Sequence, residues 1–90
     1  MNKGDLIDAV CTETGLSKAD AARAVESVFS VITGVLKQGE QISLVGFGTF
    51  TVKTRAARTG RNPRTGETIE IRASRVPGFR AGKGLKDAVN

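Results

Sequence analysis

This 90-residue sequence contains no histidine and only one cysteine, Cys11. Without histidine, imidazole catalysis and the usual metal clusters are excluded. Cys11 has no disulfide partner within the chain, which fits a reducing compartment. Because it lies one helical turn from Ile7, we interpret it as a small hydrophobic side chain rather than a reactive thiol. No nucleophile–base pair stands out in the sequence, so we expect neither an enzyme nor a bound cofactor.

Long apolar segments are absent as well. The first five residues lack the apolar core of a signal sequence, and no apolar run is long enough to span a bilayer. We therefore expect a soluble, cytoplasmic protein without a membrane partner. Ninety residues form one small domain, which buries little surface and needs help from disulfides, metals or oligomerisation. Since only oligomerisation remains, we expect a dimer.

The charge is positive and unevenly distributed. The net charge is +5. Residues 1–45 carry four basic and six acidic side chains, whereas residues 46–90 carry ten basic and three acidic ones. Five of the positive charges fall between Lys53 and Arg64, where no acidic and almost no apolar residue occurs. A segment of this kind cannot stabilise itself by burying a core, so its composition favours a polyanionic partner.

The first half of the chain has the spacing of two helices. Apolar residues at helical spacing precede Gly15, a plausible helix end. Ser17 is then a candidate cap of a second helix, with Asp20 in its first turn, and Gly39 is expected to end it. The apolar stripe of this second helix is wide enough to contact both the first helix and a second subunit. Its main members are Ala21, Val25, Val28, Phe29, Ile32, Val35 and Leu36.

The second half predicts a β-ribbon followed by a short helix. Residues 41–45 and 49–54 alternate as strands around a turn that contains Gly46 and Gly48, two glycines that suggest unusual backbone angles or close approach to another chain. The basic run continues as a strand to a turn at residues 62–66, and residues 68–76 return beside it. We expect residues 76–79 to break this strand, and residues 80–89 to form a basic helix weakened by two glycines.

Three ordered blocks of sequence carry a family resemblance. They are Val45–Phe50, Arg55–Pro63, and Val76–Phe79 continuing through Gly82-Lys83 to Leu85–Val89. In these blocks, and over essentially all 90 residues, the chain resembles the HU family of bacterial histone-like DNA-binding proteins, whose close relative is integration host factor. The resemblance implies an α+β fold and an intertwined dimer, with a helical base and two protruding β-ribbon arms.

The resemblance also implies that residues 1–90 form a single domain with two parts. Residues 1–45 would form a mainly helical dimerisation part, and residues 46–90 the sheet, an arm over about 53–75, and the C-terminal helix. Each arm would enter the DNA minor groove, with Pro63 at its tip as a wedge between base pairs. The hydrophobic dimer core would contain Phe29, Phe47, Phe50 and Phe79.

The implied partner is double-stranded DNA, bound by an obligate homodimer or a heterodimer with a paralogue. Arginine and lysine side chains suit phosphates and minor-groove acceptors, and a degenerate groove favours reading shape over sequence. Bent, nicked or gapped DNA should be preferred, since bending intact DNA costs energy. The candidate DNA-binding residues are Lys3, Lys53, Arg55, Arg58, Arg61, Asn62, Pro63, Arg64, Arg72, Arg80, Lys83 and Lys86.

Two acidic residues depart from the family pattern. Glu67 and Glu70 stand where relatives commonly carry lysines, and they either pair with arm arginines or weaken phosphate binding.

The leading interpretation is a non-enzymatic, sequence-tolerant protein that bends and compacts the chromosome in the nucleoid. Two alternatives stay open: a site-specific bending protein like integration host factor, and an RNA-binding protein, because basic ribbons also bind RNA.

Overall fold

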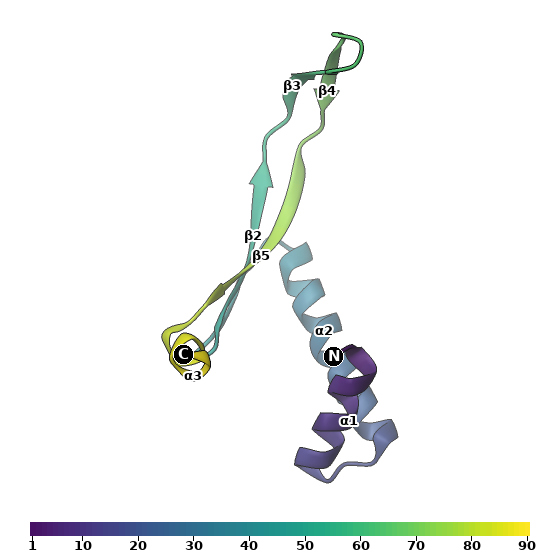
Figure 1. Ribbon diagram of the computed structural model, residues 1–90, viewed down its shortest axis with the longest axis vertical. Coiled ribbons are helices and arrows are strands. Elements are labelled where there is room, and N and C mark those ends of the chain that lie inside the picture. Colours follow the sequence, from purple (N-terminus) through teal and green to yellow (C-terminus); the bar gives the residue numbers. More distant parts are fainter. The chain divides into compact units, whose positions relative to one another are not determined.

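The computed structural model describes all 90 residues, and the chain divides into two compact units, Met1–Gly34 and Val35–Asn90. No helix is both long and apolar enough to cross a membrane. The mixture of helices and antiparallel strands confirms the α+β class (Figure 1). In chain order, the elements are α1 (Lys3–Thr14), α2 (Lys18–Lys37), β1 (Ile42–Leu44), β2 (Gly48–Arg55), β3 (Arg58–Arg61), β4 (Thr68–Ile71), β5 (Ser74–Ala81) and α3 (Lys83–Val89).

The helix limits follow from local capping. Asn2 caps α1 by accepting a hydrogen bond from the Asp5 N–H at 2.9 Å, while the Asp5 carboxylate accepts one from the Asn2 N–H at 3.0 Å. Gly15 ends α1 in the left-handed region, with φ of 74°. The Ser17 Oγ accepts from the Asp20 N–H at 3.2 Å. The predicted helix end at Gly15 and the predicted cap at Ser17 are both confirmed.

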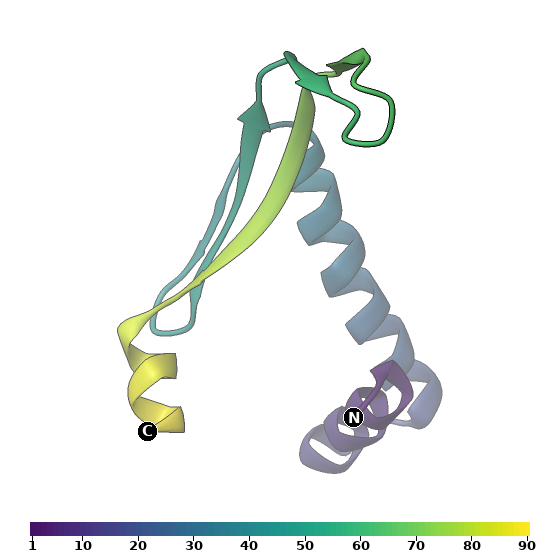
Figure 2. The ribbon, with the colours of Figure 1, turned by 45° about the horizontal axis from the view of Figure 1, so that its top comes forward.

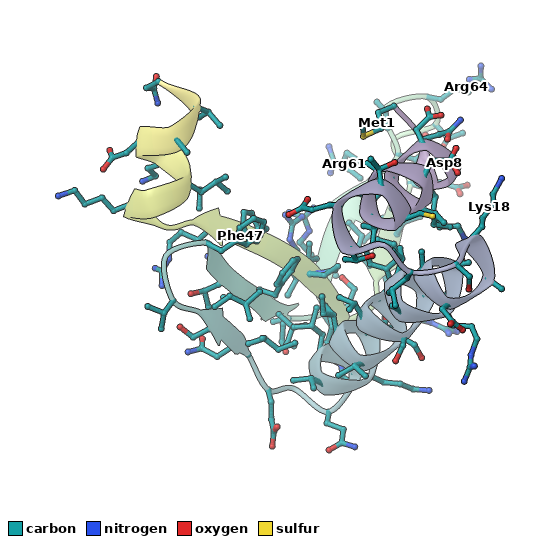
Figure 3. All side chains as sticks on the ribbon, turned by 90° about the horizontal axis from the view of Figure 1, so that it is seen from below. Met1, Asp8, Lys18, Phe47, Arg61 and Arg64 are labelled. Atoms are coloured by element: carbon teal, nitrogen blue, oxygen red, sulfur yellow. The ribbon has the colours of Figure 1, made fainter.

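In the first unit, α1 lies against the N-terminal half of α2 (Figure 2). Two ion pairs join the helices: Lys3 to Glu26 at 2.6 Å and Lys18 to Asp8 at 3.7 Å, the latter labelled in Figure 3. Only Ala21 and Val25 are buried.

The apolar stripe of α2 is therefore only partly covered within one chain. Val28 and Phe29 are 54% and 42% exposed, and Ile32, Val35 and Leu36 are half-buried.

In the second unit, three antiparallel strands form a sheet in the order β1-β2-β5. The register pairs Ile42 with Phe50, and Phe50 with Phe79. Because directly paired residues share a face and side chains alternate along a strand, one face of the sheet is apolar. The members of this face are Ile42, Leu44, Phe50, Val52, Pro77 and Phe79.

The structure corrects the prediction for residues 76–79. β5 runs through them without a break, and Pro77 lies opposite Val52. A proline is tolerated here because β5 is an edge strand, so its missing N–H removes no ladder hydrogen bond on the outer side. The predicted start of the last helix at Arg80 is also wrong: Arg80 pairs with Thr49 in the sheet, and α3 begins at Lys83.

Glycines allow close packing around the β1–β2 turn. Gly46 has φ of 80°, and a Cβ on Gly48 would lie 2.7 Å from the Arg80 carbonyl oxygen and overlap the Phe79 ring. The predicted unusual backbone angle is therefore confirmed at Gly46, whereas the close approach at Gly48 is to β5 of the same chain. A Cβ on Gly84 would overlap the Gly46 carbonyl, so this glycine permits α3 to start against the turn.

Beyond the sheet, β3 and β4 pair as a separate antiparallel ribbon, which we call the arm. The sequence predicted one continuous ribbon, and this is wrong in detail. The strands stop at Arg55 and Ile71 and resume at Arg58 and Ser74. Figure 1 shows the resulting interruption between β2 and β3 on one side, and between β4 and β5 on the other.

Candidate nucleic-acid interface

The tip of the arm is a tight, hydrogen-bonded loop between β3 and β4, as its turn residues predicted. The Asn62 N–H donates to the Glu67 carbonyl at 2.8 Å, and the Gly66 N–H donates to the Asn62 carbonyl at 2.7 Å. The Asn62 Oδ1 accepts from the Arg64 N–H at 2.9 Å. Pro63 and Arg64 are exposed, and Asn62 is half-buried. The loop therefore presents a rigid pyrrolidine ring and a guanidinium group to solvent (Figure 3 labels Arg64).

The two faces of the arm differ in chemistry. The register places Arg58 and Gly60 opposite Ile71 and Ile69, so these four residues share one face. A Cβ on Gly60 would lie 3.0 Å from the Ile71 Cδ1, which shows that the isoleucine packs over the glycine.

The other face of the arm carries Thr59, Arg61, Thr68 and Glu70. Arg58 thus lies beside apolar side chains, whereas Arg61 shares its face with a carboxylate.

Three candidate residues meet on the polar face of the sheet. Lys53 and Arg55 in β2 and Arg80 in β5 alternate with the apolar-face residues, and they line a hollow of about 300 Å³. Arg75 lies opposite Thr54, on the other face. Arg75 and Arg80 lie five residues apart in β5 and therefore on opposite faces, and the pairing register with β2 places Arg80 on the face of Lys53 and Arg55.

The interruption between sheet and arm brings further basic residues together. Arg55 and Arg58 line a hollow of about 420 Å³ with Ala56, Ile71 and Ser74. Arg72 lies in the other strand connection and, with Arg58, lines a neighbouring hollow. Basic side chains thus line both the sheet and the junction.

The remaining candidates lie elsewhere. Lys83 and Lys86 are exposed in α3, whereas Lys3 belongs to the helical unit and is engaged by Glu26. Of the four phenylalanines, Phe79 contacts both Phe50 and Phe47, with ring centroids 4.8 Å and 5.6 Å apart (Figure 3 labels Phe47). Phe29 lies on the exposed stripe of α2.

None of the ten basic side chains in residues 46–90 forms an ion pair. Both ion pairs of the chain lie in the helical unit. The pairing of Glu67 or Glu70 with arm arginines, one of the two roles considered for them, is therefore absent. Ten basic side chains without an ion-pair partner, against three acidic ones, leave residues 46–90 with a net positive charge that attracts a polyanion.

Comparison with known proteins agrees with this electrostatic picture. A family model described as "Bacterial DNA-binding protein" matches residues 1–90. The DNA-binding protein HU-beta of Pseudomonas aeruginosa is 59% identical over 90 residues, and that of Escherichia coli K12 is 58% identical, each covering 100% of both chains. The chain belongs to the HU family of bacterial histone-like DNA-binding proteins. Like other members of this family, it is a DNA-binding protein and not an enzyme.

Solved HU structures share the fold. A cocrystal structure of Anabaena HU with DNA matches with a TM-score of 0.87 at 43% sequence identity, covering 99% of this chain and 97% of the other. A V42I mutant of HU from Thermotoga maritima matches with a TM-score of 0.74 at 34% identity over 100% of both chains. Proteins of this family are nucleoid-associated.

Some contributors to the HU arm were missed by sequence reasoning. The sequence of the basic run showed no apolar face. In the structure, however, Ile69 and Ile71 of the opposite strand cover Gly60 and make the face that carries Arg58 partly apolar. They are 47% and 37% exposed. Their alternation was visible in the sequence, but their partners were not, because the register depends on where the loop closes.

Replacing the two arm carboxylates with lysines should tighten DNA binding. Glu67 and Glu70 are exposed and form no ion pair, so their charges oppose a bound phosphate backbone without aligning the ribbon. In the double variant Glu67→Lys with Glu70→Lys, we expect higher affinity and a steeper dependence of log K on log salt, by up to about 0.9 for each new phosphate contact. A fluorescence anisotropy titration over a salt series measures this. An unchanged slope would place both side chains away from the DNA.

Proposed function

We propose that this HU-family protein binds duplex DNA as a dimer, bends it with little sequence preference, and thereby compacts the chromosome within the nucleoid. The observation that carries the proposal is the combination, in residues 46–90, of uncompensated cations with an exposed proline held at the arm tip. The HU–DNA cocrystal neighbour supports it, since its fold matches nearly the whole chain.

Two groups of side chains have separate roles in this proposal. Lys53, Arg55 and Arg80 on the sheet bind phosphates, together with Lys83 and Lys86 of α3 and, once released from Glu26, Lys3. In the arm and its junction with the sheet, the residues that contact phosphates and minor-groove acceptors are Arg58, Arg61, Arg64 and Arg72. The minor groove distinguishes base pairs poorly, so these contacts follow the shape and deformability of DNA.

Pro63 supplies the wedge. Its ring has no N–H and a fixed φ, so it enters a base step without leaving a donor unpaired. Bending intact DNA costs on the order of 1–6 kcal/mol, which the added contacts must offset. Nicked, gapped or already bent DNA avoids part of this cost and is therefore preferred. The general use of apolar wedges by HU-type architectural proteins is known, and we apply it here to one residue.

The dimer is supported by the apolar surface that each unit leaves uncovered. Only Ala21 and Val25 are buried apolar residues, while Phe29, Phe47 and Phe79 are 42%, 47% and 43% exposed. A second chain that covers these rings, with Phe50, would complete one hydrophobic core and join both units into a single domain over residues 1–90. Sedimentation equilibrium measures the mass directly, and a monomer at micromolar concentration contradicts this part of the proposal.

Pro63→Ala tests the bending mechanism. We expect the bend angle to fall while affinity changes less, because the wedge is lost and the phosphate contacts remain. Energy transfer between dyes on the two duplex ends reports the bend. Pro77→Ala is the matched control, since Pro77 lies in the sheet and should leave the bend unchanged. An unaltered bend in Pro63→Ala would remove the wedge role.

The same purified protein can be used to test the two alternative functions, site-specific DNA bending and RNA binding. Equal footprints on random and selected duplexes support sequence-tolerant binding, whereas protection of one site only indicates a factor like integration host factor. Competition between duplex DNA and duplex RNA tests RNA binding, because A-form grooves differ in width and depth.

A further inference from the structure

We infer that Asn62 is a positioning residue for the Pro63 wedge and acts through the loop backbone rather than by contacting DNA. The inference rests on the proposed bending function. Asn62 is one of the candidate DNA-binding residues from the sequence. The structure shows its Oδ1 already engaged, accepting the Arg64 N–H at 2.9 Å across Pro63.

This hydrogen bond holds the peptide group that follows the proline. The peptide group before the proline is held as well, since its carbonyl, that of Asn62, accepts a hydrogen bond from the Gly66 N–H at 2.7 Å. The pyrrolidine ring therefore lies between two hydrogen-bonded peptide groups, one on each side. Because proline also restricts the residue before it to extended conformations, little freedom remains for the ring.

The rest of the loop supports the same geometry. Gly66 adopts φ of 74°, and the Asn62 N–H donates to the Glu67 carbonyl at 2.8 Å. The Thr65 Oγ1 accepts from the Glu67 N–H at 3.3 Å. Backbone order that exists before binding does not have to be created during binding, so the wedge meets the base step with less loss of conformational entropy.

If Asn62 only positions the wedge, a substitution at this residue should change DNA bending separately from DNA affinity. Asn62→Ala removes the acceptor, and we expect the equilibrium constant between kinked and unkinked complexes to fall about three- to tenfold, the effect of one hydrogen bond. The salt slope of binding should stay constant, because no cation is removed. Gly66→Ala should reproduce the loss of bending, since a side chain is strained at positive φ.

Asn62→Asp separates positioning from contact. Aspartate keeps the acceptor oxygen but loses the amide NH₂ that a direct contact to DNA acceptors would need. We expect this variant to bind more weakly, because of its added negative charge, yet to bend DNA like the wild type at saturation. Thr68→Ala, which removes a neighbouring hydroxyl on the arm, is the matched control and should bend normally.

Energy transfer across end-labelled duplexes measures bending, and amide exchange of Arg64 by NMR measures the loop in the DNA-free protein. We expect Asn62→Ala to accelerate Arg64 exchange and reduce bending, with Asn62→Asp restoring both. The inference is overturned if Asn62→Ala bends DNA normally, or if Asn62→Asp loses bending as Asn62→Ala does. If the wild-type protein itself leaves DNA straight, the proposed function fails, whereas the exchange result still reports on the loop.

Discussion

Gly48→Ala should lower the free energy of unfolding by about 3 kcal/mol, at the upper end of the usual cost of overpacking. The added methyl group would overlap the Phe79 ring and lie 2.7 Å from the Arg80 carbonyl oxygen. Phe79 contacts both other rings of the cluster, so moving it disturbs Phe50 and Phe47 together. The carbonyl belongs to β5 and cannot move without breaking its pairing with β2.

Thermal unfolding followed by circular dichroism measures this effect, at one fixed protein concentration because a dimer unfolds with concentration dependence. For a domain of this size, the expected loss lowers Tm by more than about 10 °C. Gly78→Ala is the matched control in the neighbouring strand: its Cβ would lie 3.5 Å from the Thr51 Oγ1, an ordinary contact. Equal Tm values for the two variants would show that the Gly48 site relaxes without cost.

Removing two of the arm arginines, Arg58 and Arg61, should flatten the salt dependence of DNA binding. Arg58 and Arg61 lie on opposite faces of the arm, and neither has an internal ionic partner. Each phosphate contact contributes about 0.9 to the slope of log K against log salt. With both residues contacting phosphate in both arms of a dimer, the variant Arg58→Ala with Arg61→Ala should lose up to about 3.6 from the slope.

The control for this experiment must remove the same charge from another surface. Lys18→Ala with Arg23→Ala also deletes two positive charges, but both residues belong to the helical unit. We expect this control to leave the slope unchanged within error. If the arm variant and the control behave alike, net charge and not the arm sets the affinity. If Arg58→Ala alone accounts for the whole loss, only the face that carries Ile69 and Ile71 meets the phosphates.

The sequence correctly predicted the features that depend on interactions between residues close together in the chain. The end of α1 at Gly15, the cap at Ser17 and the loop at residues 62–66 all depend on contacts between residues close in sequence. Such interactions are visible in a single sequence because the partners lie within one turn of each other. The family resemblance added the α+β class, which the fold and the relatives confirm.

The wrong predictions concern segments whose secondary structure depends on pairing with another strand. Residues 76–79 looked like a strand break because Pro77 and Gly78 are poor strand formers, yet pairing along β2 and an outer edge free of neighbours keep β5 continuous. The extended pairing of Arg80 with Thr49 delayed the start of α3 by three positions from the prediction. Gly82 and Gly84 were expected only to weaken α3; a Cβ on either would crowd the β1–β2 turn.

By itself, the sequence determined that the positive charge concentrates in residues 46–90, that a proline follows an asparagine at a tight turn, and that the chain is an HU-like DNA-binding protein. These properties reside in residue identity and in short spacings. The tertiary structure alone decided that Lys53, Arg55 and Arg80 share a face, that Arg75 lies on the other, and that Ile71 covers Gly60. A shift of one residue in strand register would reverse each of these assignments, because neighbouring side chains alternate between the faces of a sheet.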